Sequence, residues 1–163
     1  FVLVNTINIV KIILERRPKF IPEELQDLYE GIFNNLTTRE FIYFWNMGTI
    51  RSVKDNYLIR SGEYQNNLLL ILSGTASIEV NDNKIAILDR GAFIAEISFL
   101  TGEPASADVH ADDELIFISW KNERLKNMQN ENPEFWIKLQ QALSTDLINK
   151  VRPEKKKEAQ IKD

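Results

Sequence analysis

The sequence predicts a mainly β fold, a jelly roll, barrel or sandwich, with helices at both ends of the chain. Short apolar runs dominate from about residue 50 to residue 120 and alternate with a period of two, which is typical of strands. Before residue 48 and after Trp120 the apolar residues recur at helical spacing instead. About five residues separate most of the strand-like runs, which is too few for the crossover between parallel strands. We therefore expect about eight short, antiparallel strands.

Two short helices are expected ahead of the strands. Pro22 and the two glutamates after it suit the first turn of the first helix. Thr37 and Glu40 are spaced as a capping box ahead of a second helix, which should end near Gly48. The apolar stripe of the first helix consists of Leu25, Leu28, Tyr29, Ile32 and Phe33.

Eight strand-like runs follow, separated by short polar turns. Turn-forming residues lie at 54–56, 61–63, 73–74, 81–83, 89–91 and 112–114. The runs between them are 50–53, 57–59, 68–72, 76–80, 85–87, 93–94, 107–111 and 115–120.

Two further helices are expected after the strands. Residues 122–130 suit a short one, and Asn132, Pro133 and Glu134 suit the cap and first turn of a longer one. Pro153 should end that helix and leave residues 151–163 as a charged, solvated tail. The apolar face of the longer helix contains Phe135, Trp136, Leu139, Ala142, Leu143 and Leu147.

The composition excludes most catalytic and metal chemistry. With no Cys and one His, the chain cannot form a disulfide scaffold, a Cys/His zinc site or a centre with several His ligands. No Ser/His/Asp arrangement, glycine-rich kinase loop or paired-carboxylate motif is evident, so we do not expect an enzyme. His110 is interpreted as a packed or surface residue. The acidic body between basic ends argues against a nucleic acid polymer as partner.

The amino-terminal segment has two interpretations. The chain starts at Phe1 rather than Met, which indicates a segment of a longer protein or a processed product. Residues 1–14 are strongly apolar and Arg16, Arg17 and Lys19 follow, so the segment resembles the cytoplasmic exit of a transmembrane helix. Alternatively, it is an amphipathic helix that packs on the domain or pairs with a second copy. We assign residues 1–20 to this helix and its linker, and residues 21–150 to the folded domain.

One segment, residues 91–109, interrupts the strand pattern. It reads as a strand that ends at Ile94, a single helical turn from Glu96 to Leu100, a Gly-Pro loop, and a new strand from Ala107. A helix start and a tight loop both present free backbone N–H groups, so this insert predicts an anion site.

This segment and its surroundings resemble the cyclic nucleotide-binding domain. The phosphate-binding cassette of that family runs Phe-Gly-Glu-hydrophobic-Ala/Ser-hydrophobic-Leu, then a short loop and Pro-Arg-Ala/Ser-Ala-Thr-Val. Residues 93–100 and 104–109 follow this pattern, and residues 58–63 and 70–74 match the family's strand signatures. The resemblance covers about residues 40–148. It implies an eight-stranded cyclic-nucleotide-binding-type β-roll with B/C-type helices at its carboxyl end.

The resemblance also assigns residues to the ligand. Glu96 matches the acid that accepts a hydrogen bond from the ribose 2′-hydroxyl, while Ser106 and Ala107 match donors to the cyclic phosphate. Ala105 stands where the family has its phosphate-binding Arg, and Ala95 stands where it has a Gly, so the cassette is degenerate. Arg60 and Arg90 are candidates to replace the missing Arg. The predicted ligand-binding set is Ala95, Glu96, Ile97, Ser98, Ala105, Ser106 and Ala107.

A narrower similarity is to the Popeye family, including its bacterial members, whose roll follows transmembrane helices. It depends on residues 16–18, on Leu28 and Tyr29 with Phe33, and on residues 39–41 and 97–102. It implies attachment through a segment before Phe1 and a location at the cytoplasmic face of a membrane, or in the cytoplasm if the chain is the whole protein.

Two functions follow from these resemblances. The first is a regulatory sensor that binds cAMP, cGMP or a cyclic dinucleotide, requires no other cofactor, and shifts the helix from Pro133 over the ligand. The second is a ligand-free interaction module that forms a homodimer through residues 1–14 and the face at 135–147.

Overall fold

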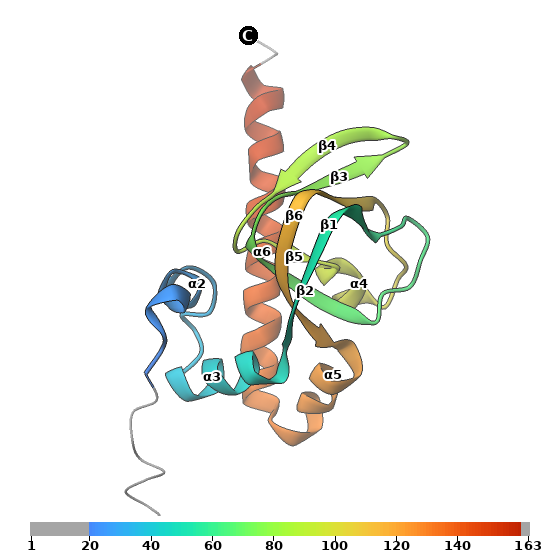
Figure 1. Cartoon of the computed structure of the whole chain (residues 1–163). Helices are drawn as coiled ribbons and strands as arrows, with labels where there is room; N and C mark the ends of the chain where they lie inside the picture. The colour runs from blue at the N-terminus through green and yellow to red at the C-terminus, as the bar shows by residue number, and fades with distance from the viewer. Residues whose placement is uncertain (1–19, 161–163) are drawn as a thin grey trace, which may run out of the picture.

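The computed structural model describes residues 20–160 of the chain (Figure 1). A curled, six-stranded sheet is flanked by helices from both ends of the described chain, so the predicted fold class is confirmed. The elements are η1 (Glu23–Leu25), α2 (Gln26–Ile32), α3 (Thr38–Met47), β1 (Thr49–Ile59), β2 (Asn67–Ser73), β3 (Ala76–Val80), β4 (Asn83–Leu88), β5 (Phe93–Ile94), α4 (Glu96–Thr101), β6 (Asp108–Lys121), α5 (Asn122–Glu131) and α6 (Pro133–Gln160).

Six strands account for the eight predicted runs because two pairs of runs are continuous. β1 includes both runs before Arg60, and β6 includes both runs after Ala107. The polar residues between the runs form an irregularity rather than a turn, since the register shifts between Lys54 and Asn56 and Asp55 has a φ of 42°. An irregularity of this kind bends the strand that carries it and increases the local twist.

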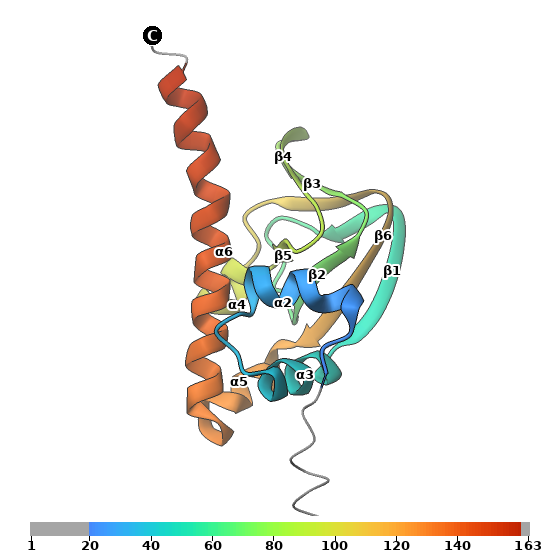
Figure 2. The same ribbon diagram turned by 90° about the vertical axis from the view of Figure 1, so that its left-hand side faces the viewer.

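β6 lies at the centre of the sheet. It pairs antiparallel with β1 along most of its length, and with β3 and then β2 as it runs towards Lys121. β4 lies beyond β3 and β5 lies beyond β2, which gives the order β4-β3-β6-β2-β5. The sheet therefore encloses one space inside the roll and turns its other face towards the helices (Figure 2).

Two hydrophobic clusters fill these two spaces. In β2, Leu68 and Leu70 belong to the cluster shared with the helices, whereas Leu69 and Ile71 belong to the cluster inside the roll. Successive side chains of a strand point to opposite faces, so this continuous apolar run is buried on both sides.

The helices pack on the outer face of the sheet through aromatic side chains. Phe44 of α3 stacks on Trp120 with ring centroids 4.3 Å apart, and the Trp120 Nε1–H donates a 2.8 Å hydrogen bond to the Phe44 carbonyl. The predicted capping box is present, since Thr37 accepts from the Glu40 N–H and the Glu40 carboxylate accepts from the Thr37 N–H.

α6 crosses the domain beside α2, α3 and α4, and its carboxyl end projects past the sheet (Figures 1 and 2). Phe135, Leu139 and Leu143 are fully buried in the helical cluster. The apolar face that the dimer hypothesis assigned to a partner is therefore largely covered by the domain itself.

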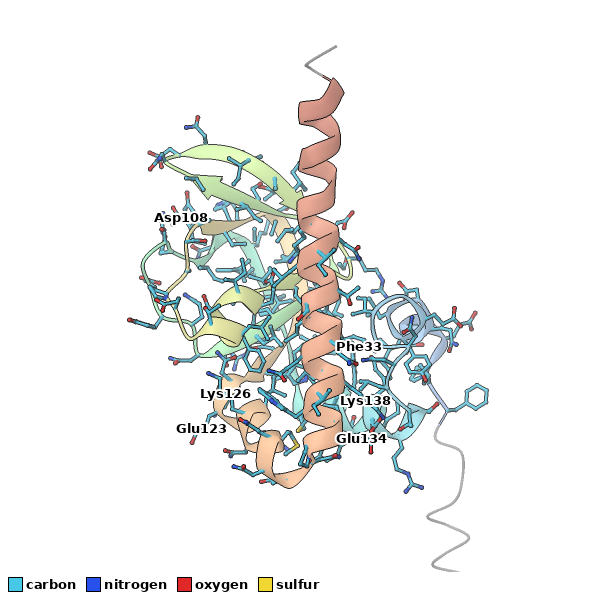
Figure 3. The ribbon with its side chains drawn as sticks, turned by 180° about the vertical axis from the view of Figure 1, so that it is seen from behind. Phe33, Asp108, Glu123, Lys126, Glu134 and Lys138 are labelled. Atoms are coloured by element: carbon cyan, nitrogen blue, oxygen red, sulfur yellow. The ribbon has the colours of Figure 1, made fainter. Side chains whose placement is uncertain are left out.

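Ion pairs hold the first half of α6 to the rest of the domain. Lys138 lies one turn from Glu134 on the helix (Figure 3) and binds Glu134 at 2.9 Å and Glu40 of α3 at 3.1 Å. The other half of the helix differs from the prediction, because α6 continues through Pro153 to Gln160. The missing proline N–H removes one hydrogen bond, but the Glu, Lys, Ala and Gln residues that follow are strong helix formers.

The turn between β2 and β3 requires glycine at Gly74. Its φ is 87°, in the left-handed region. A Cβ at this position would lie 2.3 Å from the carbonyl oxygen of Glu114 in β6. The turn therefore packs directly on the backbone of the central strand.

The structure does not describe the amino-terminal segment. Residues 1–19, with the predicted apolar helix and most of its basic linker, lie outside the described residues, as do residues 161–163. No helix among residues 20–160 is both long enough and apolar enough to cross a membrane.

Candidate ligand-binding site

A pocket opens from the inside of the roll where β5, α4 and the start of β6 meet. Its volume is about 240 Å³, and the β3–β4 hairpin contributes part of the wall. Most of the wall is apolar and comes from Ile59, Ile78, Val80, Ile85, Leu88, Ile94 and Val109. An occupant would therefore meet an aliphatic surface on the strand side, and polar groups at the cassette and at Lys150 of α6.

All seven residues that the sequence assigned to a ligand line this one pocket. β5 ends at Ile94 and α4 begins at Glu96, as the insert predicted. Ser98 is buried, Ala105 and Ala107 are half-buried, and Ile97 and Ser106 are exposed at the rim. Two segments about ten residues apart in the sequence thus converge on one cavity, as the resemblance implies.

Ala95 joins β5 to α4 in a conformation that favours glycine. Its φ is 69° and its ψ is 17°, and its carbonyl accepts a 2.9 Å hydrogen bond from the Phe99 N–H. A left-handed alanine costs about 1 kcal/mol relative to its preferred conformations. The chain therefore makes a left-handed turn here with an alanine, and Ala95 lines the pocket.

Glu96 is the buried charge of the site, with 6% of its surface exposed. Its partner comes from α6: Lys150 Nζ lies 2.5 Å from Glu96 Oε1 and 2.7 Å from the Phe93 carbonyl oxygen. Asp146, one turn earlier on α6, also lies 2.7 Å from Nζ through its Oδ2. Burial raises the pKa of the Glu96 carboxyl above its usual range, and the Lys150 ammonium opposes that rise.

Ala105 leaves the cassette without its usual cation. Its backbone is fixed by Gly62, whose N–H donates to the Ala105 carbonyl at 2.7 Å, and by Glu63, whose carbonyl accepts from the Ala105 N–H at 2.9 Å. These bonds place the Ala105 methyl at the pocket wall. Of the residues that the structure describes around the pocket, Lys150 is the one basic residue.

Neither arginine expected as a replacement reaches the pocket. Arg60 pairs with Asp108 at 3.2 Å and lies over the Tyr57 ring. Arg90 forms a bidentate pair with Asp27 of α2 at 2.8 Å. The replacement hypothesis is therefore wrong for both, because each guanidinium is held by a carboxylate elsewhere.

Sequence reasoning missed Lys150. The signal was present, because Asp146 and Lys150 are spaced i, i+4 and so lie on one face of a helix. From the sequence, Lys150 is only the last residue of the predicted domain. No residue near it in the sequence indicates that this face of the helix contacts the cassette.

The single histidine of the chain lies outside this pocket. His110 is half-buried beside Tyr57, with Asp55 at 3.5 Å and Asp112 at 3.8 Å from its ring nitrogens, which agrees with a packed, structural residue. Within the described part of the chain, no group of three or more His, Asp or Glu side chains gathers as a metal site would require.

The curled roll, the helical insert at its pocket and the helix that follows together define a cyclic nucleotide-binding domain. The cyclic nucleotide-binding domain family matches residues 50–132, about half of the chain, and the chain belongs to this family. Over 162 residues it is 23% identical to Popeye domain-containing protein 1 of Gallus gallus, covering 93% of this chain and 45% of that protein. It thus spans about half the length of this relative.

Solved structures share the fold. A cyclic nucleotide-binding domain from Methylobacillus flagellatus KT superposes with a TM-score of 0.72 at 24% identity, covering 80% of this chain and 78% of that one. The regulatory domain of Toxoplasma gondii PKA, in a co-crystal with cAMP, has a TM-score of 0.58 at 16% identity and covers 64% of this chain and 43% of that one.

Proposed function

We propose that this domain is a regulatory sensor that binds a cyclic nucleotide or a related anion in the cassette pocket. The observation that carries the proposal is the convergence of all seven assigned residues on one cavity around the buried Glu96. In this proposal Glu96 accepts a hydrogen bond from the ribose 2′-hydroxyl, and Ser106 and the Ala107 N–H face the cyclic phosphate. The residues bind and orient the ligand, and no bond of the ligand is broken.

The missing arginine sets the expected affinity. Losing one member of a buried charge pair costs about 2 to 5 kcal/mol, which weakens binding by about 30-fold to several thousand-fold. A domain of this family with Ala105 should therefore bind cyclic nucleotides weakly, with dissociation constants that approach the millimolar range.

Restoring the arginine tests the proposal. We expect Ala105→Arg to bind cAMP or cGMP at least tenfold more tightly than the wild-type chain in calorimetry. Ile87→Arg is the matched control, because Ile87 is 63% exposed and does not line this pocket, so it adds the same charge without entering the cassette. Binding that tightens equally in both variants indicates non-specific attraction. Absence of heat for cAMP, cGMP and cyclic di-GMP at millimolar concentration, with wild type and Ala105→Arg both folded, contradicts the proposal.

One observation favours a second function, a ligand-free interaction module. Glu96 already has a cationic partner in Lys150, so the pocket charge is compensated without a ligand. In this alternative, residues 1–14 form the homodimer contact, since the α6 face is largely covered. Sedimentation of the full chain and of a chain lacking residues 1–17 discriminates: a dimer that becomes a monomer supports it, and monomers in both cases exclude it.

We also propose attachment to the cytoplasmic face of a membrane through a segment before Phe1. The similarity to a Popeye domain-containing protein supports this. Fractionation of the full-length gene product tests it, because a protein recovered only in the soluble fraction contradicts membrane attachment.

A further inference from the structure

The cassette pocket is occupied at its polar end by a side chain of the domain itself. Lys150 Nζ lies within 2.7 Å of three oxygen atoms, on Glu96, Phe93 and Asp146. Two of the three donors of the lysine ammonium form hydrogen bonds with Glu96 Oε1 and the Phe93 carbonyl, and the Asp146 carboxylate pairs with the ammonium at 2.7 Å without a hydrogen bond. Glu96 Oε1 belongs to the carboxylate that the proposed function assigns to the ribose hydroxyl, and it is one of the three oxygens.

The second half of α6 has few other anchors to the domain. Leu143 is the last fully buried residue of the helix. Beyond it Leu147 is only half-buried, and Ser144, Ile148 and Asn149 are exposed. The contact between Lys150 and the cassette is therefore the main interaction that holds residues 144–150 against α4 and β5.

The pocket is also small with α6 in this position. Its volume of about 240 Å³ lies below the range of about 300 to 1,000 Å³ that is usual for sites of small-molecule ligands. Lys150 is part of the wall, so moving it away both enlarges the pocket and frees the Glu96 carboxylate.

We propose that Lys150 is a tethered competitor for the cassette: its ammonium pairs with Glu96 in this structure, and an occupant that takes Glu96 displaces Lys150 and releases residues 144–150 of α6. This regulation rests on the proposed function, because it concerns the same pocket. It differs from the sequence-based expectation, in which the helix closes over the ligand. In this mechanism the bound state has the less ordered helix end, and the release is the output signal.

Hydrogen–deuterium exchange of the full chain tests the direction of the change. With saturating cAMP, we expect faster exchange of the amides at 144–150. Slower exchange there, as a closing helix would give, overturns the proposal. This comparison needs no variant and is independent of any effect of mutation on folding.

Two lysine variants on α6 isolate the contact. Lys150→Met keeps the length of the side chain and removes the ammonium, while Lys138→Met removes a comparably exposed ammonium that binds Glu40 and Glu134 away from the pocket. We expect Lys150→Met to exchange rapidly at 144–150 without ligand and to bind cAMP at least tenfold more tightly. Lys138→Met should do neither. Weaker binding by Lys150→Met means that Lys150 supports the ligand and overturns the proposal.

The two proposals can fail separately. If neither wild type nor Lys150→Met binds a cyclic nucleotide, the sensor function is refuted. In that case the anchoring of residues 144–150 by Lys150 stands if Lys150→Met loses protection there, and it falls if protection is retained. If Lys150→Met binds a cyclic nucleotide and the wild type does not, the result supports both the ligand site in the pocket and the competition by Lys150.

Discussion

The close approach of Gly74 to β6 gives the sharpest stability prediction. In Gly74→Ala, the left-handed φ of 87° at this position destabilises the alanine by about 1 kcal/mol. This is a net value, because alanine also makes the unfolded chain less flexible, which opposes the loss. The added methyl would lie 2.3 Å from the Glu114 carbonyl oxygen, so β6 or the turn must shift. Forcing extra volume into a packed site costs about 2 kcal/mol more. We therefore expect a total loss of about 3 kcal/mol in the free energy of unfolding.

Gly62→Ala is the matched control for this prediction. Gly62 has nearly the same φ, 83°, but nothing lies within 4 Å of the position of its Cβ. Gly62→Ala should lose only about 1 kcal/mol in the free energy of unfolding, which is the cost of the left-handed conformation. Urea unfolding followed by tryptophan fluorescence measures both variants, with unchanged m-values as the check on two-state behaviour. Equal losses in the two variants would refute the contact between the β2–β3 turn and the central strand.

Two further predictions concern the amino-terminal helices. Thr37→Ala removes the hydroxyl that accepts from the Glu40 N–H and should lower the free energy of unfolding by about 1 kcal/mol, measured by urea titration; an unchanged midpoint contradicts the capping role. The hydrogen bond from Arg90 lowers the pKa of Asp27 from 3.8 to about 2, so this pair stabilises the fold above the unfolded pKa and the stabilisation is lost as the pH falls towards 2. Because Asp27 is largely exposed, solvent screening limits the effect to about 0.5 kcal/mol. Asp27→Asn should be less stable than wild type at pH 6 and nearly equal to it at pH 2, and a constant difference at both pH values contradicts the assignment.

Features with local causes were predictable from the sequence. The capping box at Thr37 and the short helix after Ala95 depend on residues within one or two turns of each other. The family pattern then identified the residues around Glu96, because it carries information about the three-dimensional site that periodicity alone does not.

Features that depend on distant partners were not predictable. Polar residues 54–56 and 112–114 are typical of turns, yet each lies within a continuous strand because the two segments face each other across the β1–β6 pair. The position of Lys150 likewise depends on how α6 lies across the domain. The sequence could not decide whether the candidates Arg60 and Arg90 reach the pocket for the same reason, since the carboxylates that bind them belong to other elements.

The pairing of β1 with β6 also constrains how the chain folds. Thr49 pairs with Ser119, about 70 residues further along the chain, and contacts of such long range slow folding. During synthesis, β1 has no partner on this edge until β6 has left the ribosome. Until then its row of backbone N–H and C=O groups is open to pairing with another chain. Truncation before residue 121 should therefore produce aggregation rather than a smaller folded unit.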